Sequence, residues 1–298
     1  MSTNNSSTKR KTPRRTSKKN AKSSKRTRLG VTSVIWFLLV TGIIGLTARH
    51  LLAKPSTTSE LPKGSFGDLE NVVTNPSLKE QLINYRGMRV SFNSDHHIPN
   101  WVAWELTATE TEGDIPRANN FANDTDVAGC PDPWDYSYSG YDRGHMAPAG
   151  DMKWDSQAMQ QSFLLTNICP QAKSLNTGTW KRLEEKCRQR AVADSAIIIV
   201  SGPILTDTIR EHIGDTRVSV PKRFFKVVLS PYSNPPQAIG FIMPNASFKG
   251  GMQVAAVSID EVEAVTGHDF FASLPDSLET KLESQCKFNQ WSNIPKKR

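Results

Sequence analysis

A run of twenty residues without a charged side chain, residues 29–48, limits what this chain can fold into. A helix of that length spans roughly 30 Å at about 1.5 Å per residue, which matches the hydrocarbon core of a bilayer. The run therefore predicts a single transmembrane helix. It separates a short N-terminal tail from a globular part that begins after it.

The tail carries the positive charge of the chain. Residues 1–28 contain eleven Lys and Arg and no Asp or Glu, whereas the whole chain has a formal net charge of +8. Without the tail, 26 basic residues remain against 29 acidic ones, a net charge of −3. The basic composition is therefore no argument that the folded part binds nucleic acid, because the distribution of charge matters more than its sum.

The same charge asymmetry predicts an orientation in the membrane. Eleven basic residues precede the apolar run, and only Arg49 and Lys54 follow it closely. By the positive-inside rule, we expect a cytoplasmic tail (1–28), an anchor (29–48), a Pro/Ser/Thr-rich linker (49–68) and an exported domain (69–298) on the periplasmic or extracellular side. Two alternatives stay open, a cleaved signal peptide with secretion and an organellar targeting sequence.

The exported part has the pattern of an α+β fold. Strands are expected at 100–106, 195–202, 223–230 and 237–245, where β-branched and aromatic residues gather. Helices are expected at 154–163, 178–193 and 259–267. Since strands and helices do not alternate regularly, we predict a mixed, mainly antiparallel sheet with flanking helices.

The domain contains four cysteines, Cys130, Cys169, Cys187 and Cys286. An even number in an exported domain permits disulfides, and four cysteines allow three pairings. Free buried thiols are the alternative, because a domain of this size does not need covalent links. No pair has the Cys-x-x-Cys spacing of a zinc site.

The segment GYDRGHMAPAGDMKW, residues 140–154, places chemically active side chains close together. His145 can accept a proton from water near neutral pH, and Arg143 can bind an anion. Asp142 can orient its neighbours. A four-residue match such as DRGH arises often by chance, so this segment alone does not identify a function.

A second polar segment follows at residues 163–190, FLLTNICPQAKSLNTGTWKRLEEKCRQR. Asn176 is expected to open a helix on which Trp180, Glu184 and Arg188 follow at spacings of four, along one side. The alternative is an Asn-capped surface helix with an ordinary Glu184–Arg188 ion pair.

Together the two segments resemble the DNA/RNA non-specific endonuclease family, the ββα-metal nucleases with a DRGH motif that include mitochondrial endonuclease G. The matching text is DRGHMAPAGDMKW, SFLLTNICPQAKSLNTGTWKRLEE and, less closely, NWVAWELT, VSGPIL, VPKRFFKVVL, GFIMPN and VEAVTGHDFFASLPD. The resemblance covers residues 83–288 and implies a ββα-metal finger active site.

The resemblance also implies roles for individual residues. His145 is similar to the general base, Asn176 to the direct protein ligand of Mg²⁺ (with Mn²⁺ or another divalent cation as substitutes), and Glu184 to the acid that holds the metal's water. The remaining residues similar to family positions are the phosphate-binding Arg143, Arg188 and Arg117, and the supporting Asn167. Asp142 is expected to be structural.

The sequence thus predicts a membrane-anchored, exported, Mg²⁺-dependent endonuclease that cleaves DNA and RNA with little sequence preference. Its expected partners are DNA and RNA, the membrane through residues 29–48, and a second copy of the chain, since the family often forms dimers. Two alternatives stay open, a nucleic-acid-binding module without catalysis and a phosphodiesterase acting on another substrate.

Overall fold

The computed structural model describes residues 69–294. The expected tail, membrane anchor and linker (1–68) and the last four residues lie outside this range. Among residues 69–294, no helix combines the length and the apolar character that crossing a membrane requires.

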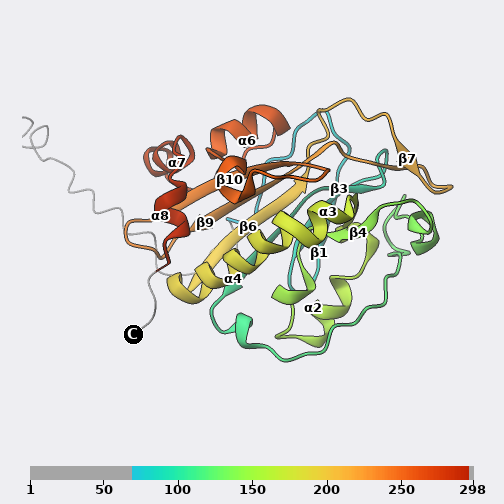
Figure 1. The fold of residues 1–298 in the computed structure, drawn as a ribbon, viewed down its shortest axis with the longest axis horizontal. Helices are drawn as coiled ribbons and strands as arrows, with labels where there is room; N and C mark the ends of the chain where they lie inside the picture. Colours follow the sequence, from blue (N-terminus) through green and yellow to red (C-terminus); the bar gives the residue numbers. More distant parts are fainter. Residues whose placement is uncertain (1–68, 295–298) are drawn as a thin grey trace, which may run out of the picture. The chain divides into compact units, whose positions relative to one another are not determined.

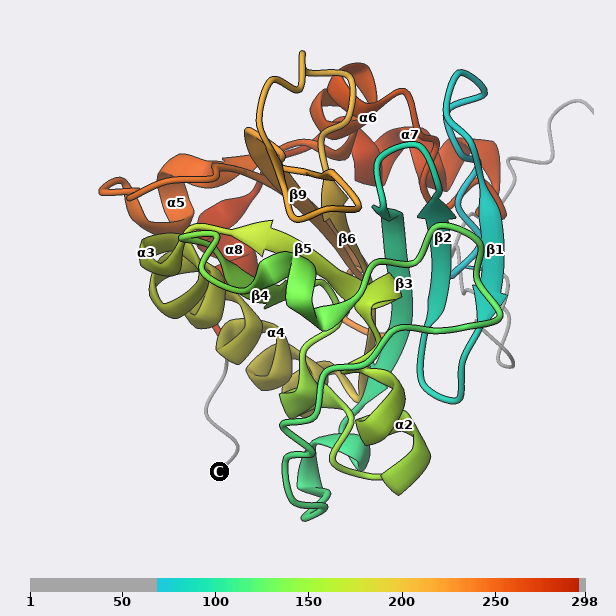
Figure 2. The same ribbon diagram turned by 90° about the vertical axis from the view of Figure 1, so that its right-hand side faces the viewer.

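A seven-stranded sheet forms the centre of the domain (Figure 2). Its strand order is β1-β2-β3-β6-β9-β10-β11, and every neighbouring pair is antiparallel. The mainly antiparallel sheet that was expected is therefore present, and within the described residues all of its strand pairs are antiparallel. Its strands are β1 (Gln81–Asn84), β2 (Arg89–Asn93), β3 (Ile98–Thr107), β6 (Ala196–Pro203), β9 (Arg223–Ser230), β10 (Gln237–Pro244) and β11 (Ala256–Val257).

The sheet is covered on both faces, so its central strand is apolar on both sides. In β6, Ile197 and Ile199 belong to one hydrophobic core, whereas Ile198 and Val200 belong to a second core on the opposite face. This alternation follows from the period of two of a strand. All eight residues of β6 are buried, which agrees with the continuous apolar run in its sequence.

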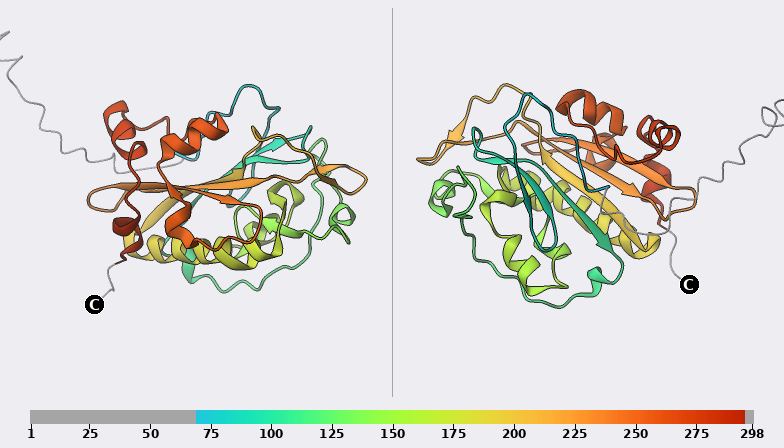
Figure 3. Two further views of the ribbon diagram at one scale, coloured as in Figure 1. Left: turned by 45° about the horizontal axis from the view of Figure 1, so that its top comes forward. Right: turned by 180° about the vertical axis from the view of Figure 1, so that it is seen from behind.

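Different helices cover the two faces (Figures 1 and 3). Helix α4 (Lys181–Asp194) packs against the first core, while α6 (Ile259–Thr266) and α7 (Asp276–Glu283) pack against the second. The expected helices at 178–193 and 259–267 are present with shifted ends. The helix expected at 154–163 is the shorter α2 (Ser156–Gln161), capped by Asp155.

The DRGH motif forms a strand beside the main sheet. Strand β4 (Asp142–His145) pairs antiparallel with β5 (Ile168–Gln171), which places His145 opposite Ile168. A helical segment follows directly, so the order strand–strand–helix that the family resemblance implies is present. The 22 residues between the two strands contain α2.

The helical segment after β5 begins earlier than its sequence suggested. It consists of α3 (Lys173–Leu175), a π-helical turn (Asn176–Trp180) and then α4. The expectation that Asn176 opens the helix was therefore wrong. Gly178 departs from helical geometry with φ −102° and ψ −115°, and a kink divides the segment there.

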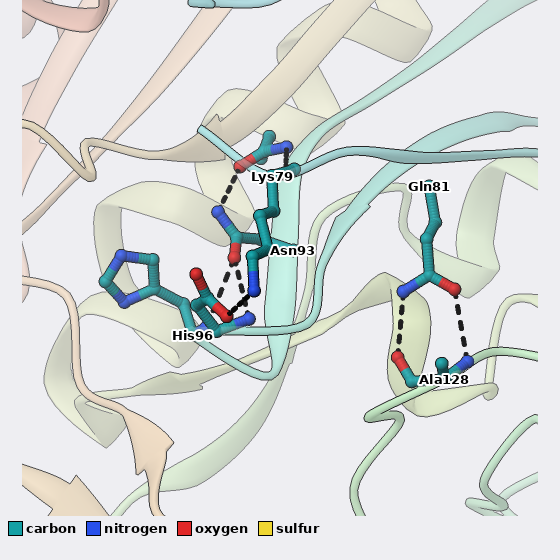
Figure 4. A network of polar contacts seen from close by, with 7 residues as sticks. Lys79, Gln81, Asn93, His96 and Ala128 are labelled. Atoms are coloured by element: carbon teal, nitrogen blue, oxygen red, sulfur yellow. Dashed lines mark hydrogen bonds and ion pairs between the residues drawn. The ribbon is translucent and has the colours of Figure 1, made fainter. Parts of the chain in front are cut away.

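The long connection between β3 and β4, residues 108–141, is tied to the edge of the sheet (Figure 4). Gln81 donates a hydrogen bond to the carbonyl of Ala128 (2.8 Å) and accepts one from its N–H (3.1 Å). In the turn between β2 and β3, the Asn93 side chain accepts a bond from the His96 N–H (3.2 Å). The Gln81 contacts attach the middle of the connection to strand β1, whereas the Asn93 contact orders the β2–β3 turn.

Short elements complete the described part of the chain. They include the hairpin β7 (His212–Ile213) and β8 (Val218–Ser219), the helices α5 (Gly251–Ala255) and α8 (Phe288–Ser292), and the 3-10 turns Glu110–Glu112, Pro133–Tyr136, Ala149–Asp151 and Leu165–Asn167. All four cysteines are free thiols in the structure, but of the buried free thiols expected as the alternative only Cys169 and Cys187 are buried.

The central strand gives a stability prediction. Ile198 is fully buried in the core beneath α6 and α7. We expect Ile198→Ala to lower the free energy of unfolding by about 2–5 kcal/mol, because it leaves a cavity in a packed core. Urea denaturation measures this. Val254→Ala, at a side chain that is 69% exposed, serves as the control and should change it by less than about 0.5 kcal/mol.

Candidate active site

A cavity of about 280 Å³ lies between the β4 segment and the kinked helix. It brings together six of the seven residues to which the resemblance gave a role in the site, although Asn176 and His145 are 31 positions apart. Four of its side chains are cationic and one is a carboxylate, so it suits an anionic ligand. The lining residues are Arg117, Arg143, His145, Pro148, Ala149, Gly150, Asn176, Thr177, Lys181, Glu184 and Arg188.

His145 stands at the end of β4 and is held between aromatic rings. Its ring centroid lies 4.8 Å from that of Phe163 and 5.5 Å from that of Phe121. The imidazole forms a hydrogen bond with the backbone of Arg143, and its buried Nε2 has no partner among the described residues. One ring nitrogen is thus available for a ligand in the cavity.

The surroundings keep His145 neutral. Burial, and after it the positive charge of Arg117, lower its pKa from 6.5 to about 3, although the hydrogen bond to the Arg143 backbone acts in the opposite direction. A neutral imidazole accepts a proton, which is the form that a general base needs. An anion bound beside Arg117 would offset the positive charge of Arg117 and so raise the pKa of His145.

Asp142 fixes the orientation of the Asn176 amide. The Asn176 Nδ2 donates a hydrogen bond of 2.9 Å to the Asp142 Oδ2. Since the amide nitrogen is engaged there, the amide oxygen is the atom that Asn176 offers to a cation. The expectation that Asp142 is structural agrees with this contact, and its specific task as an orienting group was not evident from the sequence.

Two arginines on the β4 side lie over aromatic rings. The Arg143 Nη2 donates to the Pro133 carbonyl (2.7 Å), and its guanidinium lies 5.2 Å from the Phe121 ring centroid. The Arg117 Nε donates a hydrogen bond to the Asn119 Oδ1 (2.9 Å), and its guanidinium carbon lies 4.8 Å from the Phe163 ring centroid. Stacked guanidinium groups keep free N–H edges for phosphate oxygens.

Arg188 is held from beneath by Asp151. Its Nη1 donates to the Asp151 Oδ1 at 2.7 Å, and the other Asp151 oxygen accepts from the Trp104 indole at 3.1 Å. A methyl group at Gly150 would lie 2.9 Å from the same Nη1. The backbone at this glycine thus approaches the guanidinium closely, which leaves little freedom for Arg188.

Lys226 is a buried cation beneath Glu184. It takes an inward position of β9, with Nζ 4.8 Å from the Trp104 ring and 4.7 Å from the Trp180 ring. Burial raises the pKa of Glu184 to about 7, and Lys226 is the first of the charges that oppose this rise. Lys226 therefore favours the ionised carboxylate.

Sequence reasoning missed Asp151 and Lys226. Each left a signal, since Asp151 belongs to the AGDMKW text after DRGH and Lys226 is the one charge inside the apolar strand Arg223–Ser230. An unbroken strand with a single internal lysine indicates a buried partner for that charge.

Asn167, the seventh of these residues, and Trp180, from the expected helical stripe, lie outside the cavity. Trp180, the second member of the expected stripe, is 1% exposed and packs in the core with Phe224. Asn167 is fully buried, accepts from the Ala147 N–H (2.9 Å) and donates to the carbonyls of Ala147 (2.9 Å) and Ser162 (2.8 Å). Asn167 thus supports the chain after His145 without lining the cavity.

The donors in the cavity fit a hard divalent cation. An amide oxygen from Asn176 and a carboxylate from Glu184 are oxygen ligands of the kind that Mg²⁺ prefers. Among residues 69–294, one group of three carboxylates converges closely enough to share an ion, Asp260, Glu263 and Glu283, but it belongs to α6 and α7. A cation in the cavity would thus rely on water and substrate oxygens as well.

The chain is similar to known nucleases. The family model for DNA/RNA non-specific endonuclease matches residues 66–277. The mitochondrial nuclease EXOG of Mus musculus is 32% identical over 80% of this chain and 71% of its own length. That of Danio rerio is 36% identical over 64% of this chain and 60% of its own.

A solved structure shows the same fold. It is the crystal structure of the EndoG/EndoGI complex, which concerns the inhibition of EndoG. The similarity has a TM-score of 0.62 at 25% sequence identity and covers 66% of this chain and 88% of that one. The chain therefore belongs to the DNA/RNA non-specific endonuclease family. It is a nuclease, from a family of hydrolases that depend on divalent metal ions.

The state of His145 can be tested directly. We expect its ring NMR signals to stay those of neutral imidazole down to about pH 5, because burial and Arg117 lower its pKa. Arg117→Gln removes one of these causes, so the titration midpoint should rise, while Arg117→Lys should leave it nearly unchanged. A midpoint at or above about pH 6.5 in the native protein would contradict this account.

Proposed function

We propose that the chain is a membrane-anchored, exported endonuclease that hydrolyses DNA and RNA with Mg²⁺ and little sequence preference. The single observation that carries the catalytic part is the convergence of His145, Asn176 and Glu184 on one cavity with three arginines. Hydrolysis of a phosphodiester needs a base for water, a cation for the phosphate and neutralisation of the leaving oxygen.

His145 is the proposed general base. Its Nε2 is unpartnered and its imidazole neutral, so it takes a proton from the attacking water. The two flanking phenylalanine rings hold the imidazole plane, and Asn167 fixes the backbone that follows it. The proton then resides on a nitrogen whose positive charge the bound phosphate stabilises.

Arg117, Arg143 and Arg188 are the proposed phosphate ligands. Each is oriented by a contact outside the cavity, to Asn119, Pro133 and Asp151 respectively. Preoriented guanidinium groups lose less freedom on binding and match phosphate oxygens in a planar fork. Contacts to the backbone phosphate carry no sequence information, which supports low sequence preference.

Asn176 and Glu184 are the residues that would hold Mg²⁺ and its water. When bound, the ion supplies positive charge to the phosphate oxygens and the leaving 3′ oxygen. Asp142 keeps the Asn176 oxygen turned toward the cavity, and Lys226 favours the ionised form of Glu184. A neutral amide ligand leaves the charge of the ion available for the substrate.

The membrane part of the proposal is supported by the sequence alone. The uncharged run 29–48 with eleven basic residues before it favours an anchor with the nuclease on the exported side. Protease digestion of intact and opened membrane vesicles tests this orientation. A C-terminal domain that is digested from the cytoplasmic side of intact vesicles and protected on the opposite side would contradict it.

The cleavage assay tests the catalytic part. The full chain in detergent should degrade plasmid DNA and RNA with Mg²⁺ and stop with EDTA. His145→Ala should cleave about 10²–10⁴-fold more slowly, because the general base is lost, while DNA binding is kept. His212→Ala, an exposed histidine of β7, is the matched control. Equal cleavage by His145→Ala and the native chain, or no cleavage by the native chain, would contradict the proposal.

Asp142 provides a test of the metal ligand. Asp142→Asn removes the charged acceptor that orients the Asn176 amide, so the Mg²⁺ concentration for half-maximal cleavage should rise about 10–100-fold. Asp95→Asn, at an exposed carboxylate paired with Lys79, is the control and should leave it unchanged. An unaltered Mg²⁺ requirement in Asp142→Asn would show that this orientation does not matter.

A further inference from the structure

Two exposed aromatic side chains lie in a loop beside the cavity. The aromatic loop, residues 132–141, leads into β4 and contains Trp134, Tyr136, Tyr138 and Tyr141. Tyr136 is 3% exposed, whereas Trp134 is 79% exposed and Tyr138 is exposed to the full extent of its reference value, 105%. Single exposed apolar residues are common on proteins, but two large rings within five residues leave an unusual amount of apolar surface in water.

The aromatic loop is connected to the catalytic strands. The carbonyl of Pro133 accepts the 2.7 Å hydrogen bond from Arg143, so Trp134 follows the residue that holds a phosphate-binding arginine. The Tyr136 hydroxyl donates to the carbonyl of Ile168, the residue paired with His145 in the β4–β5 ladder. The two exposed rings thus stand on either side of a residue anchored to the active-site ladder.

Hydrogen bonds hold the aromatic loop in one conformation. Asp132 accepts from the Trp134 N–H (3.0 Å), while Asp135 accepts from the Asp132 N–H (2.9 Å) and the Thr216 N–H (2.9 Å). Burial alone would raise the pKa of Asp135, but the bonds from Thr216 and its neighbours hold it below its usual value. The β7–β8 hairpin therefore holds the loop in place. Gly214 of the hairpin packs so closely against Asp135 that a Cβ atom added to Gly214 would lie 2.3 Å from the Asp135 Oδ1.

The conformation of Tyr138 is costly for its residue type. Its φ is +58°, in the left-handed region that a bulky side chain seldom adopts. The ring recovers no packing energy for this, since it stays in solvent. Strain of this kind persists where the surrounding structure enforces it and is concentrated at binding sites.

The occupant that suits these rings is an unpaired nucleobase. Every base has an aromatic face, and stacking on an exposed protein ring is a main source of affinity for single strands. In a duplex the base faces are covered by neighbouring base pairs. If the arginines of the cavity bind the phosphate backbone, the bases that flank the bound phosphate would lie close to the aromatic loop, because its Pro133 carbonyl contacts Arg143.

We propose that Trp134 and Tyr138 form a stacking surface for unpaired bases, which makes single-stranded nucleic acid the preferred substrate. This inference rests on the proposed function, since the cavity must bind a phosphodiester for the rings to meet a base. The preference arises from binding of the strand and leaves the chemical step unchanged.

The test is a binding titration of the full chain in EDTA, where cleavage is stopped. The probes are a fluorescein-labelled oligothymidylate and a duplex of similar length, followed by fluorescence anisotropy. Trp134→Ala and Tyr138→Ala should each weaken binding of the oligothymidylate by about tenfold and change duplex binding much less. Tyr138→Phe, which keeps the ring, should bind like the native chain.

Tyr232→Ala is the matched control. Tyr232 is also an exposed tyrosine, 47% exposed, but it follows β9, at the opposite end of that strand from the β7–β8 hairpin. The eight residues of β9 extend about 26 Å, so this ring cannot reach the same strand segment near Arg143. Its removal should affect neither probe.

A kinetic measurement separates the two levels of the proposal. With Mg²⁺, Trp134→Ala and Tyr138→Ala should raise KM for the oligothymidylate and leave kcat unchanged. If the native chain cleaves but these variants bind oligothymidylate normally, or lose duplex binding to the same extent, the stacking surface is wrong and the endonuclease proposal stands. If the native chain neither binds nor cleaves either probe, both fail.

Discussion

The active site depends on a small group of charges that are buried where the sheet meets helix α4. Asp151 and Lys226 are each 1% exposed, and neither is stable in an apolar interior without partners. Arg188 and the Trp104 indole satisfy Asp151, while Trp104 and Trp180 enclose the Lys226 ammonium. Breaking such a group leaves an uncompensated buried charge, which is strongly destabilising. The positions of the sheet, the segment after DRGH and the helix are therefore fixed relative to one another by the same contacts that hold Arg188 in the cavity.

The cavity itself is assembled from two rigid halves. The β4–β5 ladder carries His145 and Arg143, and the kinked helix carries Asn176, Glu184 and Arg188. Their direct polar connection is the hydrogen bond between Asp142 and Asn176, which joins the first residue of the DRGH motif to the first residue of the π-helical turn. Catalytic groups need this kind of fixed geometry, because small displacements reduce rates strongly. Each half is supported by contacts to the main sheet, so neither relies on the substrate for its shape.

Much of this was accessible from the sequence, and the remainder has identifiable physical causes. The strands at 196–203, 223–230 and 237–244 were anticipated because runs of β-branched residues bounded by turn residues form few structures other than strands. Six of the residues that line the cavity were anticipated through resemblance, since no local pattern joins His145 to Asn176 across the intervening chain. Asp151 and Lys226 were missed because a buried charge is recognised by its partners, which are distant in sequence. The start of the helix was misplaced because Asn176 has the type of a capping residue but lies inside a turn of irregular geometry.

The number of residues in the π-helical turn, Asn176–Trp180, determines which way the faces of helix α4 point. A residue added to or removed from a helix rotates everything beyond it by about 100°. After the wide turn, one face of α4 directs Glu184 and Arg188 to the cavity while another directs Leu183 and Cys187 to the core. Shortening the turn by one residue would swing both faces at once, exposing apolar surface and withdrawing the two charged groups together. The spacing between Asn176 and α4 is thus set by packing and by chemistry at the same time, and neither requirement can change without the other.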